Sequence, residues 1–208
     1  MGTGGREVAS GKKHNMSVCK LSNSGITVTV KALTGWDTVK ELALFTIGKV
    51  PKEDEPSEDW ERRITTACHS PIRARMFLVK MHNIPYYVSV HLVRHKIGVE
   101  HFVRTNRSDR TGRNTDGDSR STPTNHAMLI NAEALITMSR KRLCSMADPT
   151  TRMIWSTVVT ALSNVDKVVA DRCVRNCVHC GFCPEFTSCG FDKSIAFEAS
   201  RNAYIVGQ

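Results

Sequence analysis

The sequence predicts an α+β protein, because it combines strand patterns with strong helical periodicity. Residues 26–30 (ITVTV) alternate β-branched side chains, and residues 75–82 (RMFLVKMH) alternate between two faces, as strands do. From Asp148 and Pro149 to Val169, apolar side chains recur at helical spacing, with aspartate suited to the N-cap and proline to the first turn. Both kinds of element therefore belong to one chain.

Local signals predict the other elements. We expect a helix over 37–48, an acidic loop over 51–61, a helix over 85–96, a polar segment over 104–125 and a further helix over 127–144. A polar segment of this length in a compact protein is usually functional or mobile.

The length and composition exclude several classes of protein. The chain has 208 residues, enough for one domain of ordinary size or two small ones. Hydrophobic residues make up 40% and charged residues 24%, which excludes a collagen-like or wholly disordered chain. No run of about 18 apolar residues occurs, so the sequence predicts neither a transmembrane helix nor a membrane partner.

The charge favours an anionic partner. Lysine and arginine total 29 against 20 acidic residues, which leaves a net charge of +9. Nucleic acids, nucleotides, phosphate-bearing cofactors and acidic lipids all suit such a chain, and a basic surface with no partner is the alternative.

The N-terminal residues predict where the protein acts. Residues 1–15 lack the apolar stretch of a secretory signal peptide, and we interpret them as a disordered extension with Met16 as an alternative start. Without an export signal we expect a cytoplasmic, reducing location. There the cysteines are thiols or metal ligands rather than disulfides.

The densest group of chemically active side chains lies in residues 91–110 (HLVRHKIGVEHFVRTNRSDR). On a helix, His91 and His95 share one face and Arg94 lies beside it. Together with Lys96 they concentrate positive charge, and arginines follow in the polar segment. Arginine presents a fork that suits phosphate, so a nucleotide site is one interpretation and a basic surface stripe is the other.

A second group lies in residues 131–144. On a helix, Asn131, Leu135, Met138 and Arg142 fall on one face, with a polar side chain at each end of an apolar stripe. The two polar ends can reach one pocket. Taken alone, this pattern is weak evidence for a pocket, because an arginine near a helix C-terminus is also stabilised by the macrodipole.

The tail, residues 173–208, is rich in cysteine, and its C-x2-C spacings suit tetrahedral zinc or an iron–sulfur cluster. Because five cysteines are available for four ligand positions, the sequence does not fix which four would bind a metal. Free thiols are a third interpretation. We favour four of them as ligands of a structural zinc ion: Cys177, Cys180, Cys183 and Cys189. Cys19, Cys68 and Cys144 are isolated, which favours buried free thiols.

The two polar groups together resemble the signature of the flavin-dependent thymidylate synthases. Arg94, His95 and Lys96 stand where that family has an RHR motif, and residues 69–95 resemble it without gaps. Residues 131–144 are similar to the family's Asn-Ala-x-Ser to Leu-Arg helix. The resemblance covers roughly residues 26–170, apart from an uncertain alignment over 105–125.

The resemblance implies a fold and a reaction. The fold is a mostly antiparallel sheet packed against long helices, here in a catalytic domain over 16–172. The reaction converts dUMP to dTMP, with the carbon from methylenetetrahydrofolate and the hydride from NADPH through bound FAD. The family forms homotetramers whose active sites are shared between subunits.

The resemblance also implies roles for individual residues. FAD would be bound by His69, Arg94, His95, Lys96 and Asn131. The pyrimidine nucleotide would be bound by His91, Arg104, Asn106, Arg110 and Arg142. Arg142 would stabilise charge on the base, and Ser108 would be the signature serine, so these two are the catalytic candidates.

The sequence departs from the family pattern at several positions. Lys96 replaces an arginine, and the position expected for the signature serine is Arg104, four residues before Ser108. Either the serine has shifted to Ser108 or it is lost. Arg75 and Glu133 also replace a histidine and an arginine of the family.

These departures leave three alternatives. The substrate can be a related pyrimidine nucleotide, which is methylated or hydroxymethylated. The chain can be an inactive homologue. A basic, zinc-containing nucleic-acid-binding protein is the candidate of another class, although three tyrosines give it few stacking platforms.

Overall fold

The structure is a computed structural model and describes residues 15–21, 24–50 and 55–206. The predicted disordered extension lies outside the described residues, apart from Asn15. An antiparallel sheet with the strand order β1-β2-β3-β5-β4 forms the centre of the fold. Its strands are β1 (Met16–Lys20), β2 (Thr27–Ala32), β3 (Met76–Pro85), β4 (Val99–Val103) and β5 (Pro123–Asn131).

The helices fall into three groups along the chain. Two precede β3, namely α1 (Trp36–Phe45) and α2 (Glu58–Thr66), with a 3-10 turn, η1 (Ser70–Ala74), after them. Two short helices, α3 (Tyr86–Leu92) and α4 (Ser108–Thr111), flank β4. The rest follow β5: α5 (Ala132–Arg142), α6 (Pro149–Ser163), α7 (Lys167–Arg172), α8 (Asn176–Cys180), η2 (Phe191–Lys193) and α9 (Ile195–Val206).

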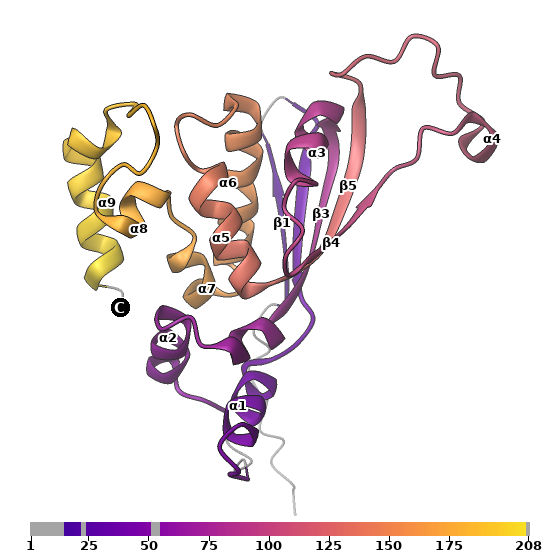
Figure 1. Cartoon of the computed structure of the whole chain (residues 1–208). Helices are drawn as coiled ribbons and strands as arrows, with labels where there is room; N and C mark the ends of the chain where they lie inside the picture. Colours follow the sequence, from indigo (N-terminus) through magenta and orange to yellow (C-terminus); the bar gives the residue numbers. More distant parts are fainter. Residues whose placement is uncertain (1–14, 22–23, 51–54, 207–208) are drawn as a thin grey trace, which may run out of the picture.

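Helices that follow β5 cover one face of the sheet. In Figure 1, α5, α6 and α7 lie on one side of the strands, with α8 and α9 beyond them, and the chain between β4 and β5 extends away as an arm that carries α4. Helix α6 contacts β1 and β2, and α5 contacts β5. The structure thus has the α+β architecture with an antiparallel sheet and covering helices that was predicted.

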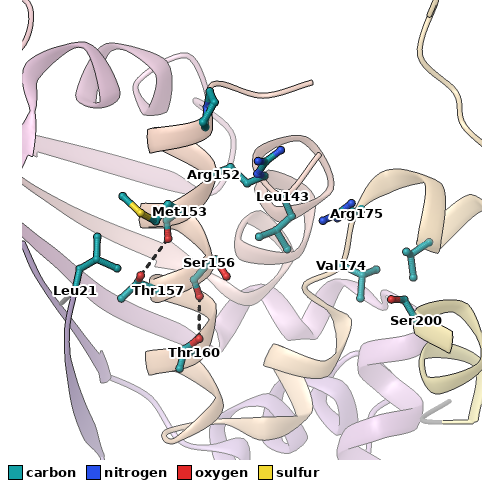
Figure 2. A pocket seen from close by; sticks show the side chains of 12 residues that line it. Leu21, Leu143, Arg152, Met153, Ser156, Thr157, Thr160, Val174, Arg175 and Ser200 are labelled. Carbon is teal, nitrogen blue, oxygen red and sulfur yellow. Dashed lines mark hydrogen bonds between the residues drawn. The ribbon is translucent and has the colours of Figure 1, made fainter. Parts of the chain in front are cut away.

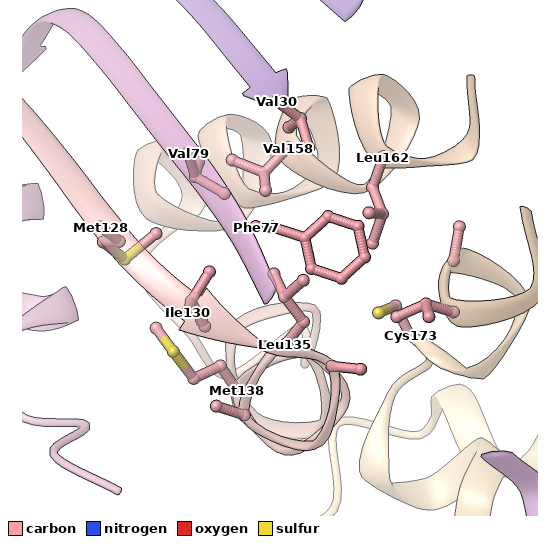
Figure 3. Packing of buried hydrophobic residues seen from close by; sticks show 14 of the residues in the cluster. Val30, Phe77, Val79, Met128, Ile130, Leu135, Met138, Val158, Leu162 and Cys173 are labelled. Atoms are coloured by element: carbon pink, nitrogen blue, oxygen red, sulfur yellow. The ribbon is translucent and has the colours of Figure 1, made fainter. Parts of the chain in front are cut away.

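The core forms where the apolar face of the sheet meets α5 and α6. The alternation predicted for residues 75–82 is confirmed, because Phe77 and Val79 are fully buried while Lys80 is exposed. Figure 3 shows Phe77 surrounded by side chains of the sheet and the helices, including Val158 and Leu162 of α6. Burial of this aliphatic surface is the main force that holds the helices on the sheet.

One predicted helix proved partly wrong. Residues 127–131 belong to strand β5, and the helix occupies only Ala132–Arg142. Met128 and Ile130 are fully buried against the helices while Ala127 and Leu129 are partly exposed, a period of two that marks a strand. Long-range pairing with β3 decides this stretch.

Three further boundaries differ from the prediction. The helix predicted over 85–96 ends at Leu92, so Arg94, His95 and Lys96 lie in the following turn. Within the predicted loop 51–61, helix α2 begins at Glu58, since the Ser57 side chain accepts a hydrogen bond from the Trp60 amide. The polar segment 104–125 contains α4 and the start of β5.

The long helix predicted from Asp148 begins as expected and then breaks. Asp148 accepts a hydrogen bond from the Thr151 amide at 2.8 Å and caps α6. The helix ends at Ser163, and Asp166 caps the separate helix α7 through the Val169 amide. The break places the Asp166 carboxylate inside the protein.

Asp166 forms a buried ion pair that joins two distant parts of the chain. Its Oδ2 accepts from Arg75 Nε at 2.8 Å, and the two side chains are only 2% and 8% exposed. Arg75 also lies over the Phe77 and Trp36 rings. Arg75, one of the departures from the family pattern, is thus a structural residue at the start of β3.

Helices α8 and α9 form a small second cluster. Cys177, Val178, Phe197 and Tyr204 are its buried residues. Arg172 ties it to α7, because its guanidinium donates to the Tyr204 carbonyl at 2.6 Å and lies over the Tyr204 ring. The tail is therefore folded, but on few apolar side chains.

Among the described residues, no helix combines the length and the apolar character that crossing a lipid bilayer requires.

Replacing Asp166 by asparagine tests the buried pair. Asparagine keeps the helix cap, but it leaves Arg75 buried without a counter-charge, so we expect the free energy of unfolding to fall by about 3–5 kcal/mol. Urea denaturation measures this loss. The matched control is Asp109→Asn in the exposed pair with Arg107, for which about 0.5 kcal/mol or less is expected. Equal losses in the two variants would show that the buried pair has no special weight.

Candidate functional site

Arg142 is the centre of the candidate site. It is the last residue of α5, and its guanidinium reaches across to the segment around α3. Its Nε donates to His95 Nε2 at 2.9 Å, and one Nη donates to the His91 carbonyl at 2.5 Å. Arg142 therefore connects two segments that are about fifty residues apart in the sequence.

The charge on Arg142 has no acidic partner among the described residues. None of its ion pairs or hydrogen bonds involves a carboxylate, and burial together with nearby Arg94 lowers its pKa. A half-buried cation without a counter-ion is unfavourable, because the lost hydration is not replaced by an opposite charge. The site is thus prepared for an anion or for developing negative charge.

The turn after α3 is fixed by a close backbone approach. Gly98 adopts a φ of +72°, and a Cβ at this position would lie 2.6 Å from the Asn131 side-chain nitrogen. The main-chain N–H of Asn131 donates to the Gly98 carbonyl at 3.0 Å. Only glycine fits here, and the turn that carries Arg94, His95 and Lys96 is thereby held against the start of α5.

Asn131 also has a structural role at the start of α5. It precedes α5 as its N-cap, and its Oδ1 accepts from the Ala134 amide at 2.8 Å. The prediction that Asn131 and Arg142 share one face within a helix is therefore wrong in detail, since Asn131 lies just before the helix. Its side-chain nitrogen still faces the turn at Gly98.

His95 is neutral at physiological pH. Burial, Arg142 and His101 lower its pKa to about 4. Because Arg142 Nε donates to Nε2, the single ring proton must lie on Nδ1, which has no acceptor among the described residues. His95 can therefore offer one N–H to a ligand without adding charge.

His91 is also held, from the other side of α3. Its Nδ1 lies 2.8 Å from Thr151 Oγ1, and that hydroxyl donates to Asp148 at 3.0 Å. Its pKa is lowered by burial first and then by Arg142. The N-terminus of α6 thus fixes His91, whose carbonyl receives Arg142.

Two histidines that the sequence analysis missed complete the support. His101 Nε2 donates to the His95 carbonyl at 2.7 Å, and its Nδ1 lies 2.9 Å from His126 Nε2. Burial and then His101 lower the pKa of His126 to about 4, and its Nδ1 is buried without a partner. Because His101 and His126 lie on paired strands, only knowledge of the β4–β5 register would have revealed the contact.

The exposed cations around Arg142 are suited to phosphate. Arg94 and Lys96 are exposed and form no ion pair with another described residue, and Arg120 is close enough to lower the pKa of His91. The residues present fit a phosphate-bearing cofactor or substrate, because they combine unpaired cations with a neutral histidine donor.

The other predicted site residues lie elsewhere. Ser108 begins α4 on the arm, which Figure 1 shows far from α5. Arg104, Asn106 and Arg110 are exposed along the same arm, and His69 is exposed before η1. Within a single chain, the structure therefore brings together His91, Arg94, His95, Lys96, Asn131 and Arg142 but neither His69 nor the arm residues.

Glu133 is already paired. Its carboxylate accepts a hydrogen bond from Arg73 Nε of η1 at 2.5 Å. Its charge is therefore compensated locally and is not directed at Arg142.

The predicted zinc ligands are not assembled. In the described part of the chain, no three His, Cys, Asp or Glu side chains are arranged to hold a metal ion. Cys180 is exposed and contacts Asn176 Oδ1 at 3.6 Å. The prediction of buried free thiols is also wrong for Cys68, which is exposed, and for Cys19 and Cys144, which are only partly buried. Zinc on the predicted set therefore has no support.

A cavity of about 760 Å³ lies between α6 and the C-terminal helices, away from Arg142. Figure 2 shows hydroxyls and two arginines around it. Thr157 and Thr160 donate to carbonyls of their own helix, and Arg152 and Arg175 bind Ser145. Because these polar groups are satisfied, the cavity is a weaker candidate than the Arg142 cluster.

Comparison with solved structures shows the fold type. Thymidylate synthase X from Helicobacter pylori, crystallised with FAD and dUMP, has a TM-score of 0.57 at 12% identity, covering 70% of this chain and 98% of that chain. The UMP/dUMP methylase PolB from Streptomyces cacaoi, bound with 5-Br dUMP, has a TM-score of 0.52 at 14% identity, covering 70% and 94%.

Comparisons at the level of sequence, by contrast, find no match. No protein-family model matches the chain, and no curated protein matches it. At 12% and 14% identity, the structural likeness shows that the chain has a fold of the thymidylate synthase X type.

Proposed function

We propose that the protein is a flavin-dependent enzyme that methylates dUMP to dTMP, with methylenetetrahydrofolate as carbon donor and NADPH as reductant. The observation that carries this proposal is Arg142, a half-buried guanidinium whose hydrogen bonds go to a neutral ring and a carbonyl rather than to a carboxylate. A related pyrimidine nucleotide as substrate is the alternative within the same chemistry.

The neighbours in fold support this choice of substrate. The two solved structures named above were determined with dUMP and with 5-Br dUMP, and one of them also with FAD. Both ligand sets carry phosphate next to a heteroaromatic ring. The Arg142 cluster has matching chemistry, since exposed cations surround a half-buried guanidinium.

The roles of the residues follow from their positions. Arg94 and Lys96 bind phosphate groups, because they are exposed and unpaired within the described chain. Arg142 binds the pyrimidine carbonyls and stabilises the negative charge that develops when the ring is attacked. His95 donates its Nδ1 proton in a hydrogen bond and keeps Arg142 oriented through Nε2.

FAD, when bound, would supply hydride transfer, which no protein side chain can provide. His95 and Asn131 line the turn against which the flavin would lie, and the protein contributes position and electrostatics. Gly98 keeps this turn close to Asn131, so the binding surface is pre-organised.

The arm accounts for the remaining site residues other than His69 if the enzyme is a homotetramer. Ser108, Asn106 and Arg110 extend away from their own Arg142 cluster and are exposed. A neighbouring subunit would receive them in its site, and a two-fold interface would let two subunits exchange their arms reciprocally. Each active site then combines Arg142 of one subunit with Ser108 of another.

Flavin binding is the first prediction. The purified protein should be yellow or take up FAD, and Arg94→Ala should weaken FAD binding about tenfold, since one phosphate contact contributes about 1.4 kcal/mol. Absorbance or fluorescence titration measures the affinity. The control is Arg63→Ala on α2, another exposed arginine, with unchanged affinity. Colourless protein that never binds FAD, but binds DNA or RNA with steep salt dependence, would contradict the proposal.

Replacing Arg142 by lysine should abolish most turnover without unfolding the protein. Lysine keeps the positive charge but cannot hold the His95 ring and the His91 carbonyl together in a fixed fork. We expect the rate of dUMP methylation to fall at least about 100-fold. Mass spectrometry of the nucleotide product follows the reaction, and Arg152→Lys is the control. Retention of most activity in the Arg142 variant would remove it from the reaction.

Mixing two inactive variants tests the shared site. Ser108→Ala and Arg142→Ala should each be inactive alone. Coexpressed in equal amounts, they should regain about a quarter of the wild-type activity, because random assembly pairs intact residues from different subunits in that share of sites. If Ser108 and Arg142 acted within one chain, the mixture would stay inactive. Full activity of Ser108→Ala alone would show that the serine has no catalytic role.

A further inference from the structure

Four cysteines that are far apart in the sequence line one small cavity in the C-terminal region. They are Cys144, Cys177, Cys183 and Cys189. Cys144 follows α5, Cys177 lies in α8, and the other two lie in the irregular segment between α8 and η2. Four free cysteines around one small space are uncommon, because their reactivity makes such a cluster a liability.

The size of the cavity suits a single atom. Its volume is about 10 Å³, close to the roughly 10–15 Å³ that one water molecule requires. Four sulfur ligands around one small space are the chemistry of a tetrahedral thiolate site. A four-iron cluster, which contains several metal and sulfide atoms, needs more room.

The surrounding groups also fit such a site. Arg175 lines the cavity together with the acidic Glu185 and Asp192, and its positive charge would offset part of the negative charge of four thiolates around a divalent ion. It is held in place by a 3.0 Å hydrogen bond to Ser145 and by packing over the Phe191 ring.

The segment between α8 and η2 is irregular. It contains no helix or strand, and it begins and ends at Gly181 and Gly190, both with positive φ. Lys141 on α5 holds the middle of the segment through a 2.8 Å ion pair with Glu185. The described thiols are not arranged as metal ligands in this structure, so metal binding would require this segment to move.

We propose that Cys144, Cys177, Cys183 and Cys189 bind one tetrahedral zinc-type ion, which fastens the C-terminal helices to the end of α5. This set replaces Cys180 of the sequence-based prediction by Cys144. Binding converts four thiols and one divalent ion into a tetrathiolate complex and releases four protons to solvent. The small cluster of buried residues around α8 and α9 explains why this region needs such a staple.

The test uses the full-length protein, reduced and stripped of metal. Titration with Co²⁺ in the absence of oxygen should saturate at one equivalent, with intense visible bands of tetrahedral thiolate cobalt, and Zn²⁺ should displace it one for one. Weak, octahedral-type absorption or no binding would overturn the proposal. A brown protein with several iron atoms per chain would overturn it in favour of a cluster.

Two matched variants identify the ligand set. Cys144→Ser should lower the affinity by more than the roughly 10–100-fold that loss of an outer-shell partner produces, whereas exposed Cys180→Ser should change it less than about twofold. The reverse result would reject this set in favour of the sequence-based one. If Cys144→Ser fails to fold, Cys189→Ser, an exposed ligand, replaces it with the same expectation.

The experiment is independent of the proposed enzymatic function. FAD binding measured before and after metal removal follows the Arg142 cluster alone. Metal binding without flavin binding would leave this inference intact, and flavin binding without metal would reject it.

Discussion

The candidate site depends on one interaction, the pair of hydrogen bonds that the Arg142 guanidinium makes across to the segment after β3. One bond holds the neutral ring of His95, and the other holds the main chain at His91. No carboxylate among the described residues neutralises the cation, so its burial carries a desolvation penalty. An anionic ligand would offset this penalty, which is why we propose Arg142, rather than the larger cavity, as the functional centre.

The sheet topology makes this interaction possible. Strand β5 enters between β3 and β4, and α5 leaves it at Asn131, beside the turn that follows α3. Gly98 lets that turn approach Asn131 closely, and the contact between His101 and the buried His126 supports it from the sheet. The buried ion pair of Arg75 and Asp166 anchors the start of β3 to the helical layer. Residues that stabilise the fold and residues that we propose to bind a ligand thus lie on the same few elements.

The C-terminal region has a much smaller apolar core than the rest of the protein. The main core joins the sheet to α5, α6 and α7 through large aliphatic contacts, whereas α8 and α9 bury only a few side chains. A small core is marginal because the buried surface grows slowly with size. The gathering of four cysteines beside it is consistent with stabilisation by ligand bonds, and it involves a cysteine that no spacing rule connects with the tail.

Local signals in the sequence were enough for the fold class, for β2, for β3 and its buried face, and for the start of α6, because caps and periodicity act over a few residues. They also identified Arg94, His95, Lys96, Asn131 and Arg142 as candidates. The tertiary structure decided the rest. Pairing with β3 turned residues 127–131 into a strand, the end of α3 at Leu92 moved His95 into a turn, and the arm separated Ser108 from Arg142 within one chain. Strand pairing, the helix end at Leu92 and our proposal of Cys144 in place of Cys180 all rest on contacts between distant residues, whose energies no local pattern contains.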